Sequence, residues 1–188
     1  DMVGERLLPA FPGIGGQIKD GILYARFPPK ILVGAMFGEI SGLVTERVEN
    51  LAQLFKTAKL PYAINKDMKA YLITHSVSDI ALVGALHFEN KIIDEKTART
   101  RKTAHRITFT LKMYLRAIQK AGVAINPSIF KIVLKCPDLI LDLFFMMWLR
   151  TNMVKDMLKP DFAINANNEI VKLNNDLLKF LSQNDVTL

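Results

Sequence analysis

The chain has 188 residues, of which 50% are hydrophobic and 23% charged, and its formal net charge at pH 7 is +7. This composition excludes a disordered protein, because half of the residues can enter a core, and the length suits one full domain plus part of another. The single cysteine, Cys136, excludes an internal disulfide bond. With no secretory leader visible, we expect a cytoplasmic protein. The basic excess attracts phosphates or carboxylates in general and identifies no particular partner.

The first 44 residues are expected to form sheet. They mix glycine, proline and short β-branched or aromatic runs, and the runs at 22–27 and 30–33 are the expected strands. The glycine-rich stretch at 13–18 predicts a turn and not a dinucleotide-binding loop. No apolar strand run precedes it, and Ile18 stands where the dinucleotide fingerprint needs a small residue.

From residue 45 onward the pattern is helical. Thr45 can cap a first helix that Pro61 ends, and Asp67 can cap a long second helix that runs to about residue 89. Further along the chain, apolar residues at helical spacing and residues that end helices, such as glycine and proline, predict helices at 94–121, 127–135, 137–159 and 165–182. Five or six helices with short connections predict a bundle-like α-helical domain.

Residues 139–149 are nearly all apolar. The run falls well short of the roughly 20 residues that a membrane-spanning helix needs, so we expect a buried or dimer-facing helix and no membrane contact.

Two other chemistries are not favoured. The basic stretch at 96–106 lacks the interleaved aromatic residues of a nucleic-acid surface, so we interpret it as the exposed first turns of a helix. His75, His87 and His105 show no metal-ligand spacing with each other or with Cys136, and no metal site is predicted.

Several short segments occur in a fixed order along the chain. They are Phe11-Pro-Gly-Ile-Gly-Gly16, Gly38-Glu39-Ile40, Thr45-Glu-Arg-Val48, Leu60-Pro-Tyr-Ala-Ile64 and Asp67-Met-Lys-Ala70. This order resembles the ketopantoate reductase (2-dehydropantoate 2-reductase) family. The resemblance implies a mainly α fold: a short β remnant of a nucleotide-binding Rossmann domain at 1–44, then a helical domain at 45–188. The helical domain would be the substrate and dimerisation domain of the 6-phosphogluconate-dehydrogenase C-terminal type. Because the chain begins at Asp1 and lacks the family's glycine fingerprint, we expect a fragment.

The long second helix carries the chemistry that the resemblance implies. In the family it presents a lysine that donates a proton to the substrate carbonyl, and an asparagine follows four residues later. Here His75 takes the lysine position, Asp79 the asparagine position, and Val83 the position of a frequent second asparagine. All three depart from the family pattern, which puts ketopantoate itself in doubt as the substrate.

Residues four apart on a helix lie side by side, so Asp79 can hold the imidazole of His75. We expect the carboxylate to raise the pKa of His75 and so favour a general acid acting on a neutral carbonyl compound. The alternative is that His75 is a packed core histidine, which is the more frequent role on a mostly apolar helix.

Three more residues take a role only through the resemblance. Glu169, within Ala166-Asn-Asn-Glu-Ile-Val-Lys-Leu173, matches the family's acidic residue near cofactor and substrate; the alternative is a solvated glutamate near a helix start. Thr151 and Asn152 fall near a family serine that binds the substrate carboxylate, although their spacing to Glu169 is longer than expected.

Two functions of different classes remain. The first is an NAD(P)H-dependent oxidoreductase that reduces a 2-oxo acid or related ketone, which in this family belongs to pantothenate biosynthesis. NADPH or NADH would be held mostly by a domain outside this chain, so the isolated fragment is expected to be inactive. The second is a catalytically degenerate module for dimerisation or ligand sensing, which the apolar run at 139–149 suits. Expected partners are a small carbonyl substrate and, as one option, a second copy in a homodimer.

Overall fold

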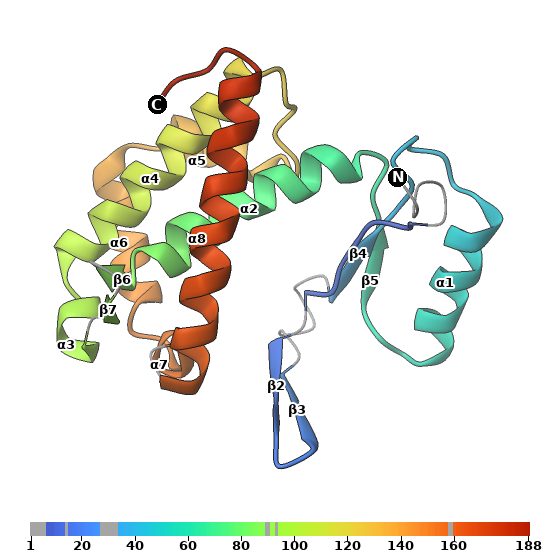
Figure 1. Ribbon diagram of the computed structural model, residues 1–188, viewed down its shortest axis with the longest axis horizontal. Helices are drawn as coiled ribbons and strands as arrows, with labels where there is room; N and C mark the ends of the chain where they lie inside the picture. Colours follow the sequence, from blue (N-terminus) through green and yellow to red (C-terminus); the bar gives the residue numbers. More distant parts are fainter. Residues whose placement is uncertain (1–6, 14, 27–33, 89–90, 93, 158–159) are drawn as a thin grey trace. The chain divides into compact units, whose positions relative to one another are not determined.

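The computed structural model describes residues 7–13, 15–26, 34–88, 91–92, 94–157 and 160–188 (Figure 1). The fold is mainly helical, as the sequence predicted. The chain divides into two compact units, Asp1–Leu72 and Ile73–Leu188. No helix in the described ranges is both long enough and apolar enough to cross a membrane.

The first unit is built on a small mixed sheet of strands β1 (Ala10–Phe11), β4 (Ala35–Phe37) and β5 (Tyr62–Ile64). The strand order is β1-β4-β5, with β1 antiparallel and β5 parallel to β4. Helix α1 (Glu46–Thr57) connects the two parallel strands, because parallel neighbours need a crossover. Phe37, Val48 and Ala52 form the buried core between sheet and helix.

The start of α1 is fixed by an ion pair. Glu39 lies just after β4 and is 6% exposed, and Arg47 donates to both of its carboxylate oxygens, at 2.6 and 2.5 Å. Thr45, the N-cap residue, also donates its hydroxyl to Glu39 and makes no side-chain cap bond to the helix. These hydrogen bonds, first from Arg47 and then from Thr45, lower the pKa of Glu39 to about 2.

The glycine-rich stretch differs from its prediction. Gly15 and Gly16 lie in strand β2 (Gly15–Lys19), which forms an antiparallel hairpin with β3 (Ile22–Arg26). Among the described residues of this stretch, Gly13 alone has a positive φ, 52°, which is the turn conformation that we expected. β3 corresponds to the strand expected at 22–27, whereas the strand expected at 30–33 lies outside the described residues.

The division between the units does not coincide with the domain boundary expected after residue 44. Helix α1 and strand β5 belong with the N-terminal sheet, since β5 pairs with β4 and α1 packs on both, and the first unit therefore extends to Leu72. Helix α2 (Met68–Gly84) begins in the first unit and continues into the second. Asp67 caps it as predicted, accepting from the backbone amide of Ala70 at 3.0 Å.

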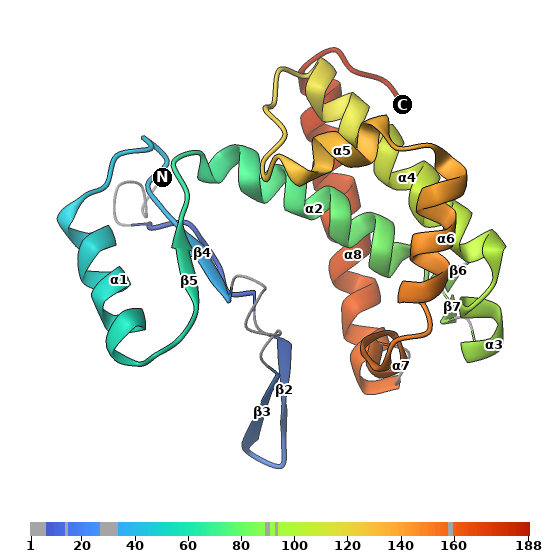
Figure 2. The same ribbon diagram turned by 180° about the vertical axis from the view of Figure 1, so that it is seen from behind.

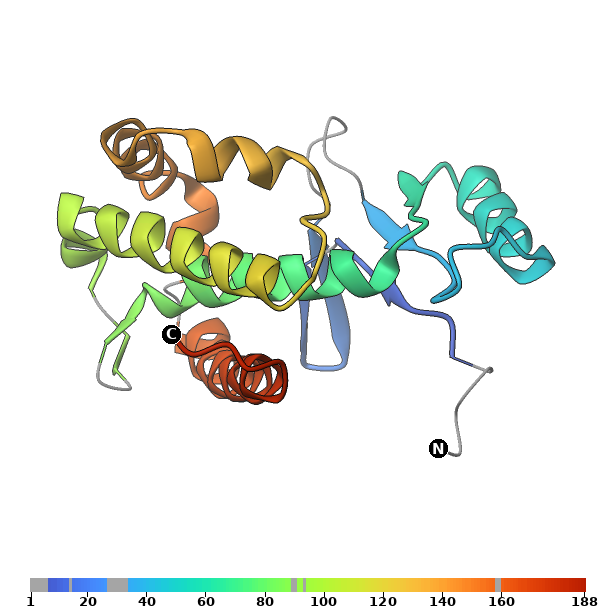
Figure 3. The ribbon, with the colours of Figure 1, turned by 90° about the horizontal axis from the view of Figure 1, so that it is seen from above.

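The second unit is a helical bundle around α2, α4 (Arg101–Lys120) and α8 (Pro160–Gln183), with α5 (Ile129–Lys135) and α6 (Asp138–Trp148) on α4. Figures 1 and 2 both show α8 crossing α2, and Figure 3 shows α6 running alongside α4. One continuous core joins these helices; its fully buried members include Val77, Ile107, Leu115, Ile118, Leu149 and Leu181.

Several helix bounds in this unit differ from the predictions. α2 ends at Gly84 instead of about 89, because the strands β6 (His87–Phe88) and β7 (Lys91–Ile92) form a hairpin there. The helix expected at 94–121 is divided into α3 (Glu95–Ala98) and α4, since Thr100 leaves the helix and caps α4. The helix expected at 137–159 is likewise divided into α6 and α7 (Asn152–Met157).

Candidate functional site

His75 and Asp79 lie on the flank of α2, one turn apart. The neighbouring residues of α2 that face the bundle are buried: Thr74, Val77 and Ser78. His75 and Asp79 therefore lie at the margin of the core. His75 Nε2 is 3.6 Å from Asp79 Oδ1, and the two side chains are 25% and 38% exposed. The spacing of four residues thus brings imidazole and carboxyl together, as predicted.

Glu169 approaches the same place from α8. A Cβ added at Gly84 of α2 would lie 3.6 Å from a methyl group of Ile170, so the two helices meet closely next to Glu169. The pKa of Asp79 is raised to about 7, first by burial of the carboxyl and then by the negative charge of Glu169. Asp79 therefore interacts with both His75 and Glu169, and we call these three residues the acidic cluster.

The expectation for His75 itself was wrong. Asp79 does not raise the pKa of the imidazole; instead, burial of the ring lowers it. Because the carboxyl of Asp79 takes up a proton near neutral pH, it offers little stable negative charge to hold an imidazolium. The group of this cluster suited to give up a proton at neutral pH is therefore Asp79, with His75 as a neutral neighbour.

Thr151 lies on the link between α6 and α7, Asn152 is the first residue of α7, and both are exposed. The backbone amide of Thr151 donates to the carbonyl of Trp148 at 2.9 Å, which closes the end of α6. The substrate-binding role expected for these two residues stays a prediction, and their described contacts have a local structural explanation.

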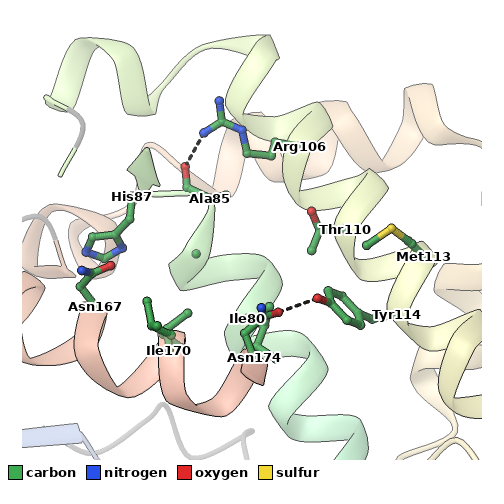
Figure 4. A pocket seen from close by; sticks show the side chains of 12 residues that line it. Ile80, Ala85, His87, Arg106, Thr110, Met113, Tyr114, Asn167, Ile170 and Asn174 are labelled. Carbon is green, nitrogen blue, oxygen red and sulfur yellow. Dashed lines mark hydrogen bonds between the residues drawn. The ribbon is translucent and has the colours of Figure 1, made fainter. Parts of the chain in front are cut away.

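A second feature of the same unit is a cavity of about 440 Å³ between α2, α4 and α8, shown in Figure 4. On α8 its lining residues lie at 167, 170, 171 and 174 and share one face. Glu169 falls on another face of α8, because each residue turns the helix by about 100°. The cavity is thus distinct from the acidic cluster.

The cavity has hydrogen-bonding groups around an apolar floor. Tyr114 donates its hydroxyl to Asn174 at 2.5 Å, and burial raises the pKa of Tyr114. Arg106 donates to the backbone carbonyl of Ala85 at 3.2 Å (Figure 4). His87 Nδ1 lies 3.0 Å from the carbonyl of Val83 and must carry the proton there, since a carbonyl only accepts.

Arg106 brings a positive charge to the cavity wall. It is the only residue with a permanently charged side chain among the described residues that line the cavity, and no acidic side chain occurs among them. Ile80, Met113 and Ile170 supply its apolar surface. This arrangement can hold a small anionic molecule with an apolar body.

This cavity was not predicted from the sequence. Helix α4 contributes four lining residues that share one of its faces: Arg106, Thr110, Met113 and Tyr114. Their spacing predicts the shared face, but it does not predict which element packs opposite that face. The sequence placed Arg106 in a basic stretch that we interpreted as the exposed first turns of a helix. The polar side chains of α4 and α8 lie close together only because α8 packs opposite this face of α4 (Figure 4).

The glycine-rich stretch and the metal-ligating residue types can be compared with the geometry of known kinds of site. Gly15 and Gly16 lie in an antiparallel hairpin, whereas a pyrophosphate is cradled at a strand-to-helix turn. Within the described ranges, no group of three or more histidine, cysteine or acidic residues is placed to hold a metal ion.

Comparisons with protein-family models, with curated proteins and with solved structures found no match to this chain.

Proposed function

We propose that this chain is the substrate-side part of an NAD(P)H-dependent carbonyl reductase, in which Asp79 delivers the proton. One observation carries the proposal: α2 and α8 bring two carboxyl groups and an imidazole together, and the pKa of one carboxyl lies near 7. Pairs of titratable groups whose pKa values are driven apart are typical of acid–base sites. The resemblance to ketopantoate reductase supports the proposal, since it would put His75 at that family's proton-donating position and Asp79 at the asparagine position one turn later.

The proposed proton step uses only residues of this chain. Reduction of a carbonyl adds hydride to carbon and a proton to oxygen, and hydride is the chemistry that NADPH or NADH supplies when bound. The carboxyl of Asp79 gives its proton to the carbonyl oxygen. The charge of Glu169 then favours rapid reprotonation of Asp79, since two neighbouring carboxylates repel each other. His75, neutral and 3.6 Å away, can pass that proton from solvent.

The cluster also limits the substrate. Once Asp79 has lost its proton, the site carries two negative charges, which would repel the carboxylate of a 2-oxo acid. A neutral ketone or aldehyde fits this charge distribution better. The helical unit would then have the 6-phosphogluconate-dehydrogenase type of C-terminal fold, with the cofactor held mainly by residues outside those described.

The test is a reductase assay on the full natural polypeptide. Titration with NADPH and with NADH comes first, followed by a screen of neutral ketones and small 2-oxo acids, measured as loss of nicotinamide absorbance. We expect turnover of a neutral carbonyl that falls above about pH 7 as Asp79 ionises. Asp79→Asn should lower kcat roughly 10²- to 10⁴-fold.

Asp176→Asn is the matched control, because it makes the same exchange at an exposed position of α8. It should leave kcat unchanged. Absence of nicotinamide binding would remove the proposal, and so would an Asp79→Asn variant with the kcat and pH profile of the unaltered protein.

A ligand-sensing module is the second candidate, and the 440 Å³ cavity favours it. Isovalerate is a suitable probe, since it joins one carboxylate to a small apolar body. Binding should raise the thermal midpoint of the protein, and Arg106→Gln should abolish that rise, whereas Arg101→Gln, at the exposed start of α4, should preserve it. Equal responses of the two variants, or no response to the probe, would exclude this candidate.

A further inference from the structure

A second, smaller cavity of about 270 Å³ lies along the second half of α4. Its other walls are Asp138 at the start of α6 and residues 186–188, which follow α8. Among the described residues, only Met113 lines both this cavity and the one in Figure 4. None of the described lining residues belongs to α2 or α8, so the space is also distinct from the acidic cluster. We call it the basic cavity, because three cations line it.

The segment that closes the basic cavity is held in place by the end of α8. The backbone amide of Val186 donates to the carbonyl of Leu181 at 3.0 Å. The preceding amide, of Asp185, donates to the carbonyl of Ser182 at 3.2 Å, and Asp185 has a φ of 57°. These features form a Schellman motif, which ends α8 and turns the chain back toward α4 (Figures 1 and 2). Val186 packs against the core of the bundle, so this wall is a fixed part of the fold.

Three cations of α4 line one side of the basic cavity. Lys112, Arg116 and Lys120 are spaced four residues apart, so they share one face of the helix. The side chain of Lys112 is the most buried of the three, at 7% exposure. Its ammonium donates to the backbone carbonyl of Cys136 and to the carboxylate of Asp138. Because an ammonium has three donors, these two acceptors leave one donor for a ligand.

The described side chains around the basic cavity carry a net charge of +2, from three cations and the carboxylate of Asp138. The hydrogen bond from Lys112 and, to a smaller extent, nearby positive charges that include Arg116 hold the pKa of Asp138 below its usual value. Asp138 therefore balances the charge of Lys112. This ion pair explains a buried lysine. It does not account for Arg116 and Lys120, which make no salt bridge within the described structure.

We propose that the basic cavity binds a small phosphate monoester with an apolar body. The two cations that no protein charge balances match the two negative charges that such a phosphate carries above about pH 6. The planar guanidinium of Arg116 can donate to two phosphate oxygens at once. Phe109, Met113 and Val186 offer apolar surface for the rest of the molecule. A monocarboxylate would leave one cation without a counter-charge.

The size of the basic cavity favours a small molecule over a larger anionic partner. Its volume of about 270 Å³ is slightly below the roughly 300–1,000 Å³ of typical small-molecule sites. Lys112 is nearly enclosed, so a flat lipid surface would contact Arg116 and Lys120 but not its ammonium. The proposal does not rest on the reductase activity, because it uses no residue of the acidic cluster.

The first test is calorimetric titration of the protein with phenyl phosphate at about pH 7.5, where the phosphate is a dianion. Benzenesulfonate is the matched probe, since it joins the same ring to a tetrahedral anion with one negative charge. We expect one phenyl phosphate per chain, bound at least roughly tenfold more tightly than benzenesulfonate. Inorganic phosphate, which lacks the ring, should also bind more weakly. Equal affinity for phenyl phosphate and either of the other probes would contradict the proposal.

Two matched variants locate the ligand. Arg116→Gln removes the bidentate donor and should weaken the binding of phenyl phosphate at least roughly tenfold. Arg101→Gln makes the same exchange at the exposed start of α4, outside the lining, and should leave the affinity unchanged. Both arginines are exposed, so circular dichroism should show a retained fold in each variant.

Four further results would overturn the proposal. The first is no binding of phenyl phosphate at about 10 mM. The second is an Arg116→Gln variant that binds phenyl phosphate as the unaltered protein does. The third is a loss of binding in Arg106→Gln that Arg116→Gln does not share, which would place the ligand in the cavity of Figure 4. The fourth is co-sedimentation with phosphatidic-acid vesicles without binding of phenyl phosphate, which would make a lipid surface the partner.

Discussion

Replacing Asp79 by asparagine tests the physical state of the acidic cluster without any substrate. In the folded chain the pKa of Asp79 is about 7, against a usual value of 3.8, so the native state binds this proton more tightly than the unfolded state does. The carboxyl therefore has no stability cost below its unfolded pKa. The cost grows as pH rises from about 4 to about 7 and is complete above that. Asparagine cannot ionise and avoids this cost.

The size of the effect follows from the shift and from solvent access. A rise of about three pKa units corresponds to about 4 kcal/mol as an upper bound. Asp79 is 38% exposed, so solvent screens part of this energy. We therefore expect Asp79→Asn to be more stable than the unaltered protein by ~1–2 kcal/mol at pH 8 and by close to nothing at pH 4.

The assay is urea unfolding, followed by circular dichroism at several pH values between 4 and 8. Glu169→Gln removes the charge that adds to the burial effect, so it should shift the pH dependence of the Asp79 cost to lower pH. Asp176→Asn, on the exposed face of α8, should show no gain that depends on pH. A difference between Asp79→Asn and the unaltered protein that stays constant from pH 4 to 8 would refute the reasoning, because it would mean that Asp79 titrates like a solvated carboxyl.

Three further substitutions have defined outcomes, each checked by urea unfolding. His105→Ala removes the hydrogen-bond partner, 3.0 Å away, of Asp142, whose side chain is only 5% exposed and whose Oδ1 has no hydrogen-bond partner within the described structure. We expect the free energy of unfolding to fall by about 2 kcal/mol, and the second change Asp142→Leu should restore it. Gly38→Ala would place its Cβ against the backbone carbonyl of Asn65, which should destabilise the first unit by about 2 kcal/mol or more. Tyr114→Phe removes the hydroxyl that bonds α8 and should cost about 1 kcal/mol.

Local signals in the sequence were enough to predict where most helices begin. Asp67 caps α2 because its side chain accepts from an amide three residues later, an interaction contained within one turn of chain. The ends and interruptions were predicted less well. α2 ends at Gly84 because the chain continues into the β6–β7 hairpin. The helix is interrupted before α4 because Thr100 adopts an extended conformation and caps α4 with its side chain.

The sequence alone determined a mainly helical chain and the pairing of His75 with Asp79, because both follow from a repeat of three to four residues. It did not determine which residue of that pair holds the proton. That depends on how deeply α2 is buried and on the charge of Glu169, which α8 brings in from far along the chain. Likewise, the sequence of a helix as rich in apolar residues as α6 does not disclose which of its sides the bundle covers. Only the packing of α6 on α4 left Leu143 and Phe144 in solvent, because burial depends on distant neighbours and not on local spacing.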